Sequence, residues 1–454
     1  MSEREFDVVV IGAGSSGEVC AGRIADGGLD VALVEGHLVG GECSYYACMP
    51  SKALLRPGQA LAEIRRVPGA AEAIAGGLDP EAVLRRRDEV ISGRDDSGQL
   101  PWLEKRGIEL FRGEGRIEGE RRVWAGGEQL AARRAVVIAT GTLAATPPID
   151  GLADAEPWTN REATTSEEVP GRLLVLGGGA VGVELAQAYA SLGSSVVLVE
   201  SEPRLVPALE EFASDQVADG LRDSGVDLRL GTKAVRVGGD KRVHVELEDG
   251  DAIEGDVLLV AIGRRPRTEG IGLETVGVEA SDYLEVDDQM RVGGRDWLYA
   301  VGDVNGRALL THAGKYQARI CADYVLGKDV TASRDRPHPP QVVFTEPQVA
   351  AVGHTLASAR DEGIDARAVD VDTSGTAGAS FYGRNAPGTS RLVVDEERKV
   401  IVGATFVGPD VAEWLHAATV AIVGEVPLER LWHAIAAYPT RSEVWLKLLE
   451  EYGL

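Results

Sequence analysis

The chain has 454 residues, of which 44% are hydrophobic and 26% charged, and its 47 basic and 72 acidic residues give a formal net charge of -25. This length predicts two to four domains. The acidic balance is spread along the chain, which indicates a solvated surface and disfavours nucleic acid and anionic membranes as partners.

The start of the chain has no signal-peptide pattern. No apolar run anywhere in the sequence reaches the roughly 18 residues that a membrane helix needs. Four cysteines are also too few for a secreted disulfide scaffold of this length. We therefore expect a cytoplasmic enzyme without a membrane partner.

The first segment, EFDVVVIGAGSSG, begins with an apolar run typical of a strand and continues with Gly12, Gly14 and Gly17. A helical stretch follows, and the next strand pattern, DVALVE, ends at Glu35. This arrangement predicts a dinucleotide site. The first glycine permits a tight turn, the second lets the backbone approach a pyrophosphate, and the third lets helix and strand pack closely. The helix N-terminus then faces the phosphates, and the acid binds a ribose diol.

The next segment, GGECSYYACMPSK, holds Cys43 and Cys48. A zinc site is disfavoured because no second Cys/His pair follows at a familiar spacing, while two inert thiols and a disulfide both remain open. Five residues of regular helix advance about 7.5 Å, whereas bridged Cα atoms lie within about 6.8 Å, so bonded cysteines cannot share one straight helix. Pro50 removes an N–H and frees the carbonyl of Tyr46, which distorts this first turn. A strained disulfide in a cytosolic chain is more typical of catalysis than of structure.

A second copy of the glycine pattern, RLLVLGGGAVG, contains Gly177, Gly179 and Gly182, and its following strand, SVVLVE, ends at Glu200. Every one of these residues is offset by 165 from its counterpart in the first copy. Either copy alone could be an ordinary glycine-rich turn, but two copies indicate a flavin and a nicotinamide, and hence hydride transfer. Glu200 favours the free 2′-hydroxyl of NADH over the phosphate of NADPH, although Arg204 nearby could soften that preference.

Proline-rich segments at 146–151 and 336–341 mark two boundaries. After residue 342 the chain reads as four strands (VVFT, AVGHT, SRLVVD and VIVGATFVG), with helices beyond 410. The Gly/Ser/Thr-rich stretch 373–383 is interpreted as a connection. This pattern predicts a separate C-terminal α+β domain.

Four further motifs follow along the chain: ATGT (139–142), AIGRRP (261–266), LYAVGD (298–303) and FTEPQVAAVG (344–353). Together with the glycine repeats and the cysteine segment, they form the pattern of a known family. The chain resembles, nearly end to end, the flavoprotein disulfide reductases, which include dihydrolipoamide dehydrogenase, glutathione reductase and mercuric reductase. The resemblance implies an FAD-dependent pyridine nucleotide-disulfide oxidoreductase that is a homodimer. It also implies an α/β fold with two Rossmann-like domains, for FAD (1–150, joined by 271–336) and NAD(P) (151–270), and a dimerisation domain (337–454).

The resemblance assigns roles to individual residues. Cys43 would be the interchange thiol that attacks substrate and Cys48 the charge-transfer thiol beside the flavin ring. Lys52 would lie near flavin N5 and pair with Glu184, although a surface salt bridge is the alternative. Asp303 would form a hydrogen bond with the ribityl chain of the flavin; the alternative is that it is only a turn residue after a strand. The helix that starts near Thr311 would face the pyrimidine edge through backbone groups or through His312. Further cofactor contacts would come from Gly41, Thr140, Gly141, Gly263 and Arg264. Ala180 stands where glutathione reductases carry a gating tyrosine, so that gate is absent.

The C-terminal segment AAYPTRSEVW departs from the family, because Tyr438 stands where many relatives have the acid/base histidine that serves the other subunit. A phenol of pKa about 10 is a poor base at pH 7 compared with an imidazole of pKa about 6.5. Glu443 matches the family's glutamate, but Thr440 and Glu443 also read as a capping box that opens the last helix. His433, expected on a helix after Pro427, is a possible substitute base or a packed surface residue.

We therefore expect electrons to pass from NADH, with NADPH possible, through FAD to a Cys43–Cys48 disulfide. The final acceptor would be a small molecule: a disulfide, another electrophile or a quinone. The alternatives are a reductive lyase or carboxylase that uses the dithiol as a nucleophile, a dihydrolipoamide dehydrogenase-like enzyme, and a flavin-based redox sensor. Mercuric reductase is disfavoured because the tail LLEEYGL has no cysteine pair.

Overall fold

The computed structural model describes residues 3–280, 282–336, 338–383, 386 and 388–454. Backbone contacts divide the chain into two compact units. The first unit comprises residues 1–50, 88–145 and 264–336, and the second comprises residues 51–87, 146–263 and 337–454. Each unit is built from strands covered by helices, so the predicted mixed α/β class is confirmed.

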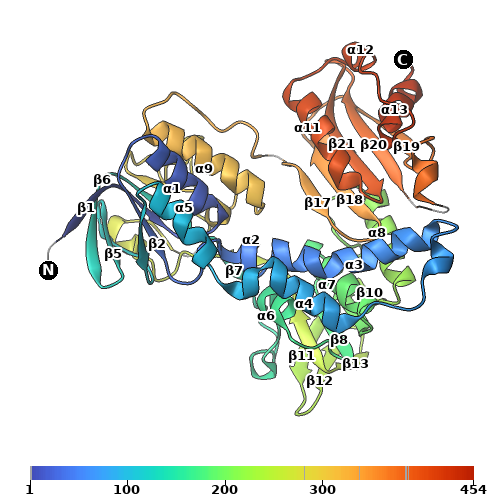
Figure 1. The fold of residues 1–454 in the computed structure, drawn as a ribbon, viewed down its shortest axis with the longest axis horizontal. Coiled ribbons are helices and arrows are strands. Elements are labelled where there is room, and N and C mark those ends of the chain that lie inside the picture. Colours follow the sequence, from blue (N-terminus) through green and yellow to red (C-terminus); the bar gives the residue numbers. More distant parts are fainter. Residues whose placement is uncertain (1–2, 281, 337, 384–385, 387) are drawn as a thin grey trace. The chain divides into compact units, whose positions relative to one another are not determined.

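The first unit is organised around a parallel sheet with the order β3-β2-β1-β6, to which β16 adds beside β6. Its central strand β1 is apolar on both faces, as expected for a strand buried on both sides. Figure 1 shows α1 and α9 packed side by side in this unit. The parallel strands and their helices are β1 (Arg4–Ile11), α1 (Ser15–Asp26), β2 (Val31–Glu35), β3 (Glu109–Arg112), β6 (Glu128–Ile138), β16 (Leu298–Ala300) and α9 (Thr311–Val325).

Short strands of the first unit extend this sheet, and the cysteine segment begins at Gly40, which forms a bridge with Gly14. Strands β4 and β5 add antiparallel to β6, and β7 pairs with β15. Their bounds are α2 (Gly41–Tyr45), α5 (Leu100–Lys105), β4 (Arg116–Gly119), β5 (Arg122–Ala125), β7 (Thr142–Ala144) and β15 (Arg264–Pro266). Helix α3 (Cys48–Arg66) starts in this unit and continues into the second.

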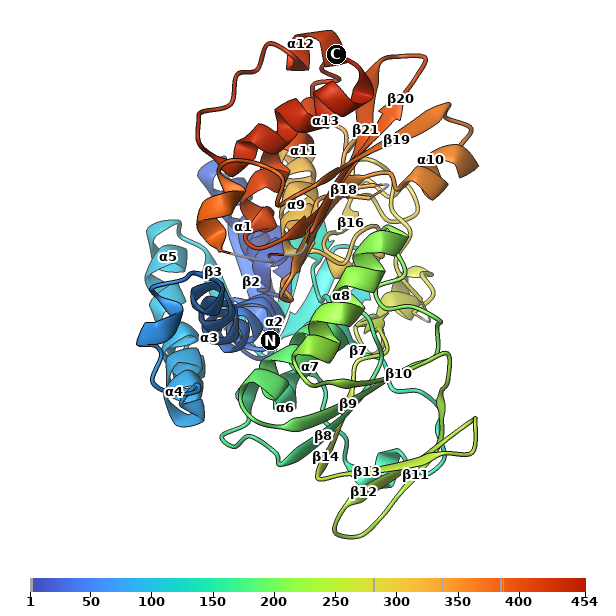
Figure 2. The same ribbon diagram turned by 90° about the vertical axis from the view of Figure 1, so that its right-hand side faces the viewer.

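The second unit repeats the nucleotide-binding plan with a parallel sheet of order β10-β9-β8-β14. Helices α3, α4, α7 and α8 contribute to the apolar core of this sheet, and Figure 2 shows α7 and α8 beside it. The elements are α4 (Pro80–Val90), α6 (Asn160–Thr165), β8 (Arg172–Leu176), α7 (Ala180–Ser191), β9 (Ser195–Glu200), α8 (Glu211–Asp223), β10 (Asp227–Leu230), β14 (Val257–Val260) and the antiparallel β11 (Ala234–Gly238), β12 (Val243–Leu247) and β13 (Ala252–Gly255).

The C-terminal part of the second unit is an antiparallel sheet with the order β17-β18-β21-β20-β19, against which α11 and α13 pack. The predicted strands and the late helices are present, but β19 was not predicted. Its sequence, ARAVDVD, alternates charged and apolar residues at the sheet edge, where only one face is buried. The bounds are β17 (Gln341–Val343), β18 (Gln348–Gly353), α10 (Leu356–Asp361), β19 (Ala366–Asp372), β20 (Thr389–Asp395), β21 (Val400–Gly408), α11 (Leu415–Val423), α12 (Leu428–Leu431) and α13 (Val444–Tyr452).

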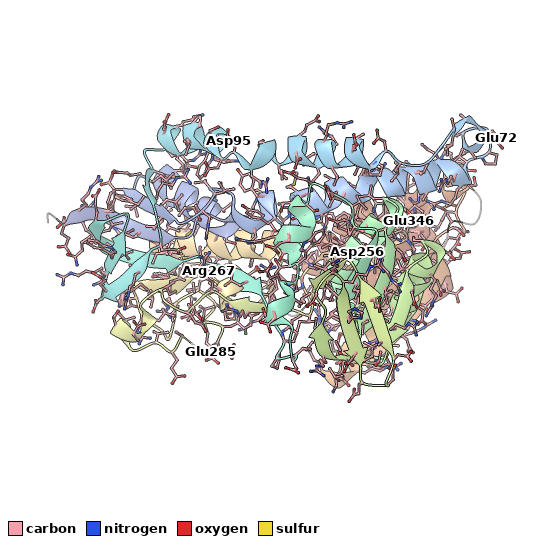
Figure 3. All side chains as sticks on the ribbon, turned by 90° about the horizontal axis from the view of Figure 1, so that it is seen from below. Glu72, Asp95, Asp256, Arg267, Glu285 and Glu346 are labelled. Carbon is pink, nitrogen blue, oxygen red and sulfur yellow. The ribbon has the colours of Figure 1, made fainter. Side chains whose placement is uncertain are left out.

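The acidic side chains are distributed over both units. Glu72, Asp95 and Glu285, labelled in Figure 3, come from different segments of the chain and point outward. This distribution agrees with the predicted solvated acidic surface. Among the described residues, none of the helices combines the length and the apolar composition needed to cross a bilayer.

Candidate active site

The first glycine turn has the geometry that a bound pyrophosphate needs. Gly12 adopts φ 102°, and a Cβ there would lie 2.4 Å from the carbonyl oxygen of Ala139. A Cβ on Gly17 would lie 1.9 Å from the carbonyl oxygen of Gly12, so that glycine is required for close helix packing. A Cβ on Gly14 meets no described atom within 4 Å, which leaves the backbone open to a ligand at the start of α1. Gly41 packs against this turn, because its own Cβ would lie 2.7 Å from the Cα of Gly14.

The second glycine turn reproduces the first. Gly177 adopts φ 109° and approaches the carbonyl oxygen of Ala261, while a Cβ on Gly182 would collide with the carbonyl oxygen of Gly177 at 1.9 Å. Gly179 again faces no described atom within 4 Å. Each unit therefore contains one cradle that fits a dinucleotide pyrophosphate at a helix N-terminus.

Each cradle is tied to the acid at the end of the neighbouring strand. Glu35 accepts hydrogen bonds from the backbone N–H groups of Ala13 and His37, both at 2.7 Å. Glu200 accepts the equivalent bonds from Gly178 and, at 2.8 Å, from Glu202. These bonds fix each carboxylate beside its glycine turn, where a ribose diol would bind.

Arg204, which we considered as a partner for a nucleotide phosphate, is engaged within its own loop. Its guanidinium donates to the carbonyl oxygens of Pro207, at 2.7 Å, and Leu209, at 3.3 Å. These bonds weaken the argument that Arg204 offsets the charge of Glu200.

The two cysteines lie in different helices, as bonded cysteines would require. Cys43 is in α2 and Cys48 begins α3, with a non-helical break at Tyr46. Both are thiols in this structure. The hydroxyl of Thr311 lies 3.2 Å from Cys43 Sγ, to which it donates, and 3.5 Å from Cys48 Sγ. Pro50 stands in the first turn of α3, where its missing N–H is tolerated.

Thr311 is a residue whose contact with the sulfurs the sequence did not reveal. It is the first residue of α9, so the positive end of that helix faces both sulfurs and favours a thiolate. The hydrogen bond with Cys48, followed by burial and the charge of Cys48, raises the pKa of Cys43, while Thr311 and Lys315 act in the opposite direction. The two sulfurs therefore do not both lose their protons readily, and the reduced pair shares one proton.

Lys52 and Glu184 form an ion pair with a distance of 2.7 Å between Nζ and Oε2. The Glu184 side chain is only 5% exposed, which rules out a surface salt bridge. Its second oxygen accepts the backbone N–H of Phe344 at 2.8 Å, and Lys52 Nζ lies 4.9 Å from the centre of the Phe344 ring. A buried carboxylate with both oxygens engaged holds the ammonium group in one place.

We expect Glu184→Gln to slow the reduction of the enzyme by NADH, because the neutral amide no longer holds Lys52 by charge. The loss of a charged hydrogen bond is worth about 1.5–3 kcal/mol, which corresponds to a rate loss of roughly 10- to 150-fold if it acts wholly on this step. Stopped-flow absorbance measures the rate. The matched control is Glu346→Gln, which breaks another shielded pair of the same unit, Arg66–Glu346 at 2.9 Å. Equal slowing in both variants would contradict a specific role for Lys52.

Asp303 lies just after β16 and is held by Thr142 and Arg264. The Thr142 hydroxyl donates to the Asp303 carboxylate at 3.0 Å, and Arg264 Nε lies 3.9 Å from the same oxygen. Burial raises the pKa of Asp303, against the opposing effects of Arg264 and Thr142. The Thr142 hydroxyl and the Arg264 guanidinium thus fix the position of this carboxyl group. Thr142 was not singled out from the sequence.

The other residues predicted to contact a cofactor differ in what the structure shows of them: backbone angles for two glycines, a hydrogen bond for Thr140 and exposure for His312. Gly141 and Gly263 adopt φ 71° and 147°, which favour glycine. The Thr140 hydroxyl donates to the carbonyl of Arg267 at 2.7 Å. His312 is exposed on the first turn of α9.

The C-terminal motif corrects one interpretation of the sequence. Thr440 and Glu443 do not form a capping box: Glu443 accepts the backbone N–H of Ala377 at 2.9 Å, and the Thr440 hydroxyl donates to Ala437. Residues 441–443 form a 3₁₀ turn before α13, so the spacing is not that of an α-helical first turn. Tyr438 is 79% exposed in the single chain.

His433 and Arg441 lie on either side of Tyr438 in the sequence and differ in exposure. A helix follows Pro427 as predicted, but α12 ends at Leu431, so His433 lies in an exposed turn beyond it and not on the helix. Arg441 is only 6% exposed, and its guanidinium lies 4.1 Å from the Trp414 ring centre and 4.5 Å from that of Tyr382. Burial lowers its pKa. These cation–π contacts anchor the turn that carries Tyr438.

Residues 6–318 match the family described as pyridine nucleotide-disulphide oxidoreductase, and residues 339–449 match its dimerisation domain. The chain belongs to this family. It is therefore an FAD-dependent oxidoreductase that uses NAD(P)H, and the resemblance seen in the motifs is confirmed.

Several curated members of the family are similar over almost the whole chain. A dihydrolipoyl dehydrogenase of Thermus scotoductus is 34% identical, covering 98% of this chain and 97% of its own. A glutathione reductase of Burkholderia cepacia is 32% identical with 99% of both covered. Among solved structures, the HOCl-induced flavoprotein disulfide reductase RclA from Escherichia coli, in its Cu(II) complex, matches with a TM-score of 0.87, 26% identity and 99% of both chains covered. These relatives differ in substrate, so they leave the acceptor undefined.

Proposed function

We propose that this enzyme carries electrons from NADH to the Cys43–Cys48 pair and then to a small-molecule acceptor. The observation that carries the proposal is that both sulfurs lie within hydrogen-bonding reach of Thr311 at the N-terminus of α9. FAD, when bound, supplies two-electron transfer between the nicotinamide and the disulfide. Gly12, Gly14 and Gly17 would hold its pyrophosphate.

The dithiol would reduce a disulfide acceptor by two exchange steps. The Cys43 thiolate attacks one acceptor sulfur, forms a mixed disulfide and releases the first thiol. The Cys48 thiolate then attacks Cys43 Sγ, releases the second thiol and restores the Cys43–Cys48 bond. Two electrons leave the protein as two substrate S–H groups form, and Thr311 stabilises the thiolates during exchange.

We propose a homodimer in which Tyr438 serves the active site of the partner subunit. The match to the dimerisation domain supports this assembly, and so does the exposure of large apolar side chains on the same part of the chain. Those side chains are Phe381, Val420, Val423, Trp432, Ile435 and Leu446. Their burial in a dimer would remove apolar surface from water. We also propose that the chain has three domains, for FAD (1–150, joined by 271–336), NAD(P) (151–270) and dimerisation (337–454). We further propose that the enzyme is cytoplasmic.

Because Glu200 is fixed beside the second cradle, we expect NADH to reduce the enzyme faster than NADPH. Its charge would repel a 2′-phosphate, whereas a free diol would donate to it. Glu200→Gln should lower the rate of enzyme reduction by NADH by roughly 10- to 150-fold, because a charged hydrogen bond contributes about 1.5–3 kcal/mol. Stopped-flow rates at varied NADH and NADPH measure this. Glu202→Gln is the control, since only the backbone of Glu202 bonds to Glu200. Equal rates with both nucleotides in the wild type would contradict the role of Glu200.

A second candidate acceptor is Cu(II), because the similar RclA structure is described as a Cu(II) complex and this chain also presents two adjacent thiols. The dithiol would give one electron to each of two Cu(II) ions and form the disulfide with loss of two protons. A screen of disulfides, quinones and Cu(II) with NADH tests both candidates. We expect one NADH to be oxidised for each disulfide that is reduced, or for every two Cu(II) ions that are reduced. If no acceptor supports turnover and the protein shows only a slow redox change, a flavin-based sensor is favoured. A lyase or carboxylase would instead be recognised by a product other than a reduced acceptor.

A further inference from the structure

Three side chains of types that bind metals, none of them assigned to the redox chemistry, lie together in the C-terminal part of the second unit. His338, His354 and Glu362 each offer one ligand atom, and these atoms all lie within 4.8 Å of one another. His338 precedes β17, His354 follows β18 directly, and Glu362 caps the C-terminus of α10. Three separate elements therefore bring these side chains together.

The backbone holds the two histidines in place. The carbonyl oxygen of His338 accepts the N–H of Gly353 at 2.9 Å, and the N–H of His354 donates to Val402 at 2.9 Å. The two imidazole rings meet edge to face with their centres 5.4 Å apart. His338 adopts φ 53°, a left-handed conformation that histidine takes more readily than most residues other than glycine.

The orientation of the His354 ring is fixed by a neighbouring hydroxyl. Ser358 Oγ lies 3.3 Å from His354 Nδ1, and Ser358 is itself held by the capping box that it forms with Thr355. The opposite nitrogen, Nε2, then faces Glu362 at 3.8 Å. A hydrogen bond to one imidazole nitrogen that orients the other is the usual support of a metal-binding histidine.

The position of Glu362 is not explained by the helix that carries it. A carboxylate at a helix C-terminus meets the negative end of the helix dipole, which favours a cation instead. The Glu362 side chain is 54% exposed, so an ion pair with one histidine would contribute little. A cation shared by all three side chains accounts for the arrangement better than a pairwise contact does.

We propose that His338, His354 and Glu362 bind a divalent transition-metal ion of the Zn²⁺ class, with water as a fourth ligand. Two imidazoles and one carboxylate form a ligand set that this class prefers. Tetrahedral bonds of about 2.0–2.2 Å place ligand atoms roughly 3.3–3.5 Å apart, so the cluster must contract, which the exposed Glu362 side chain permits. The ion would tie the segment before β17 to the end of β18 and to α10.

The test is a Zn²⁺ titration of the FAD-loaded, full-length enzyme, followed by calorimetry and X-ray absorption at the zinc edge. A Cys43→Ser/Cys48→Ser background removes the two thiols that also bind zinc. One Zn²⁺ per chain with imidazole ligands is expected, together with a higher melting temperature at saturating zinc. His338→Ala and His354→Ala should each weaken binding by more than about tenfold, as should Glu362→Gln, which changes an exposed side chain and is expected to leave the fold intact.

The matched control is His244→Ala. His244 and Glu254 form a surface histidine–carboxylate pair at 3.2 Å on the neighbouring strands β12 and β13. Removal of His244 should leave the zinc affinity unchanged. Wild-type affinity in His354→Ala and in Glu362→Gln would overturn the proposal, and so would a Cys43→Ser/Cys48→Ser protein that binds no zinc at micromolar concentration.

Discussion

Cys48→Ser should reduce turnover with disulfide acceptors by more than about 10³-fold, because the sulfur that would restore the Cys43–Cys48 bond, 3.5 Å from the Thr311 hydroxyl, is lost. Cys43→Ser should have a similar effect on turnover, because the attacking sulfur is lost. The two variants should nevertheless differ in their spectra. In Cys43→Ser the remaining Cys48 thiolate has no disulfide partner, so a long-wavelength absorbance band from this thiolate beside the flavin should be present without any reductant. In Cys48→Ser that band should be absent under all conditions.

The control for this pair is provided by the other cysteines of the chain. Cys20 and Cys321 are fully buried in α1 and α9. Cys20→Ala should therefore leave both the band and the turnover unchanged. NADH-to-quinone transfer should survive in all three variants if it bypasses the thiols. Mass spectrometry after alkylation gives an independent readout: two free thiols at positions 43 and 48 in the air-oxidised enzyme would contradict the disulfide.

The two glycine turns could be predicted from the sequence because the glycines, the following helix and the acid lie at fixed spacings along the chain. The tight turn at Gly12 and the close packing at Gly17 depend on glycine itself, and the offset of 165 residues repeats them at Gly177 and Gly182. Chain geometry also predicted that Cys43 and Cys48 cannot share one straight helix if they bond, and the structure places them in two helices. The spacing of the glycines reveals the turn, although the atom that a Cβ on Gly12 would meet belongs to the distant residue Ala139.

Contacts between distant segments could not be predicted in this way. The donation from Thr311 to Cys43 joins residues 268 positions apart, and Glu443 accepts a bond from Ala377 instead of capping its own helix. Sequence spacing favoured the local partner for Glu443, but tertiary structure supplied a different one. Arg441 was missed for a related reason: an isolated arginine gives no sign that two aromatic rings will enclose it.

Tyr438→His should raise the oxidation of dihydrolipoamide at neutral pH, by up to about 10²- to 10⁴-fold. That reaction begins with removal of a proton from a substrate thiol, whose pKa is about 8.5 or higher. A neutral phenol cannot accept this proton, whereas an imidazole can. The wild type should therefore be slow at pH 7 and should accelerate steeply as the pH rises and the substrate ionises by itself. Steady-state rates between pH 6 and pH 9 measure both effects.

Tyr438→Phe separates the proton-transfer role from a structural role. If the phenol hydroxyl contributes no base, Phe should leave NADH-to-quinone transfer nearly unchanged and should not lower the already slow thiol oxidation further. The position is 79% exposed in the single chain, so neither substitution should disturb the fold of the subunit. The gain in Tyr438→His also depends on Glu443, whose carboxylate must orient the new ring while it accepts the N–H of Ala377. Rapid dihydrolipoamide oxidation by the wild type at pH 7, lost in Tyr438→Phe, would show that the tyrosine is itself an efficient acid/base. The enzyme would then be a dihydrolipoamide dehydrogenase in which a phenol replaces the usual imidazole.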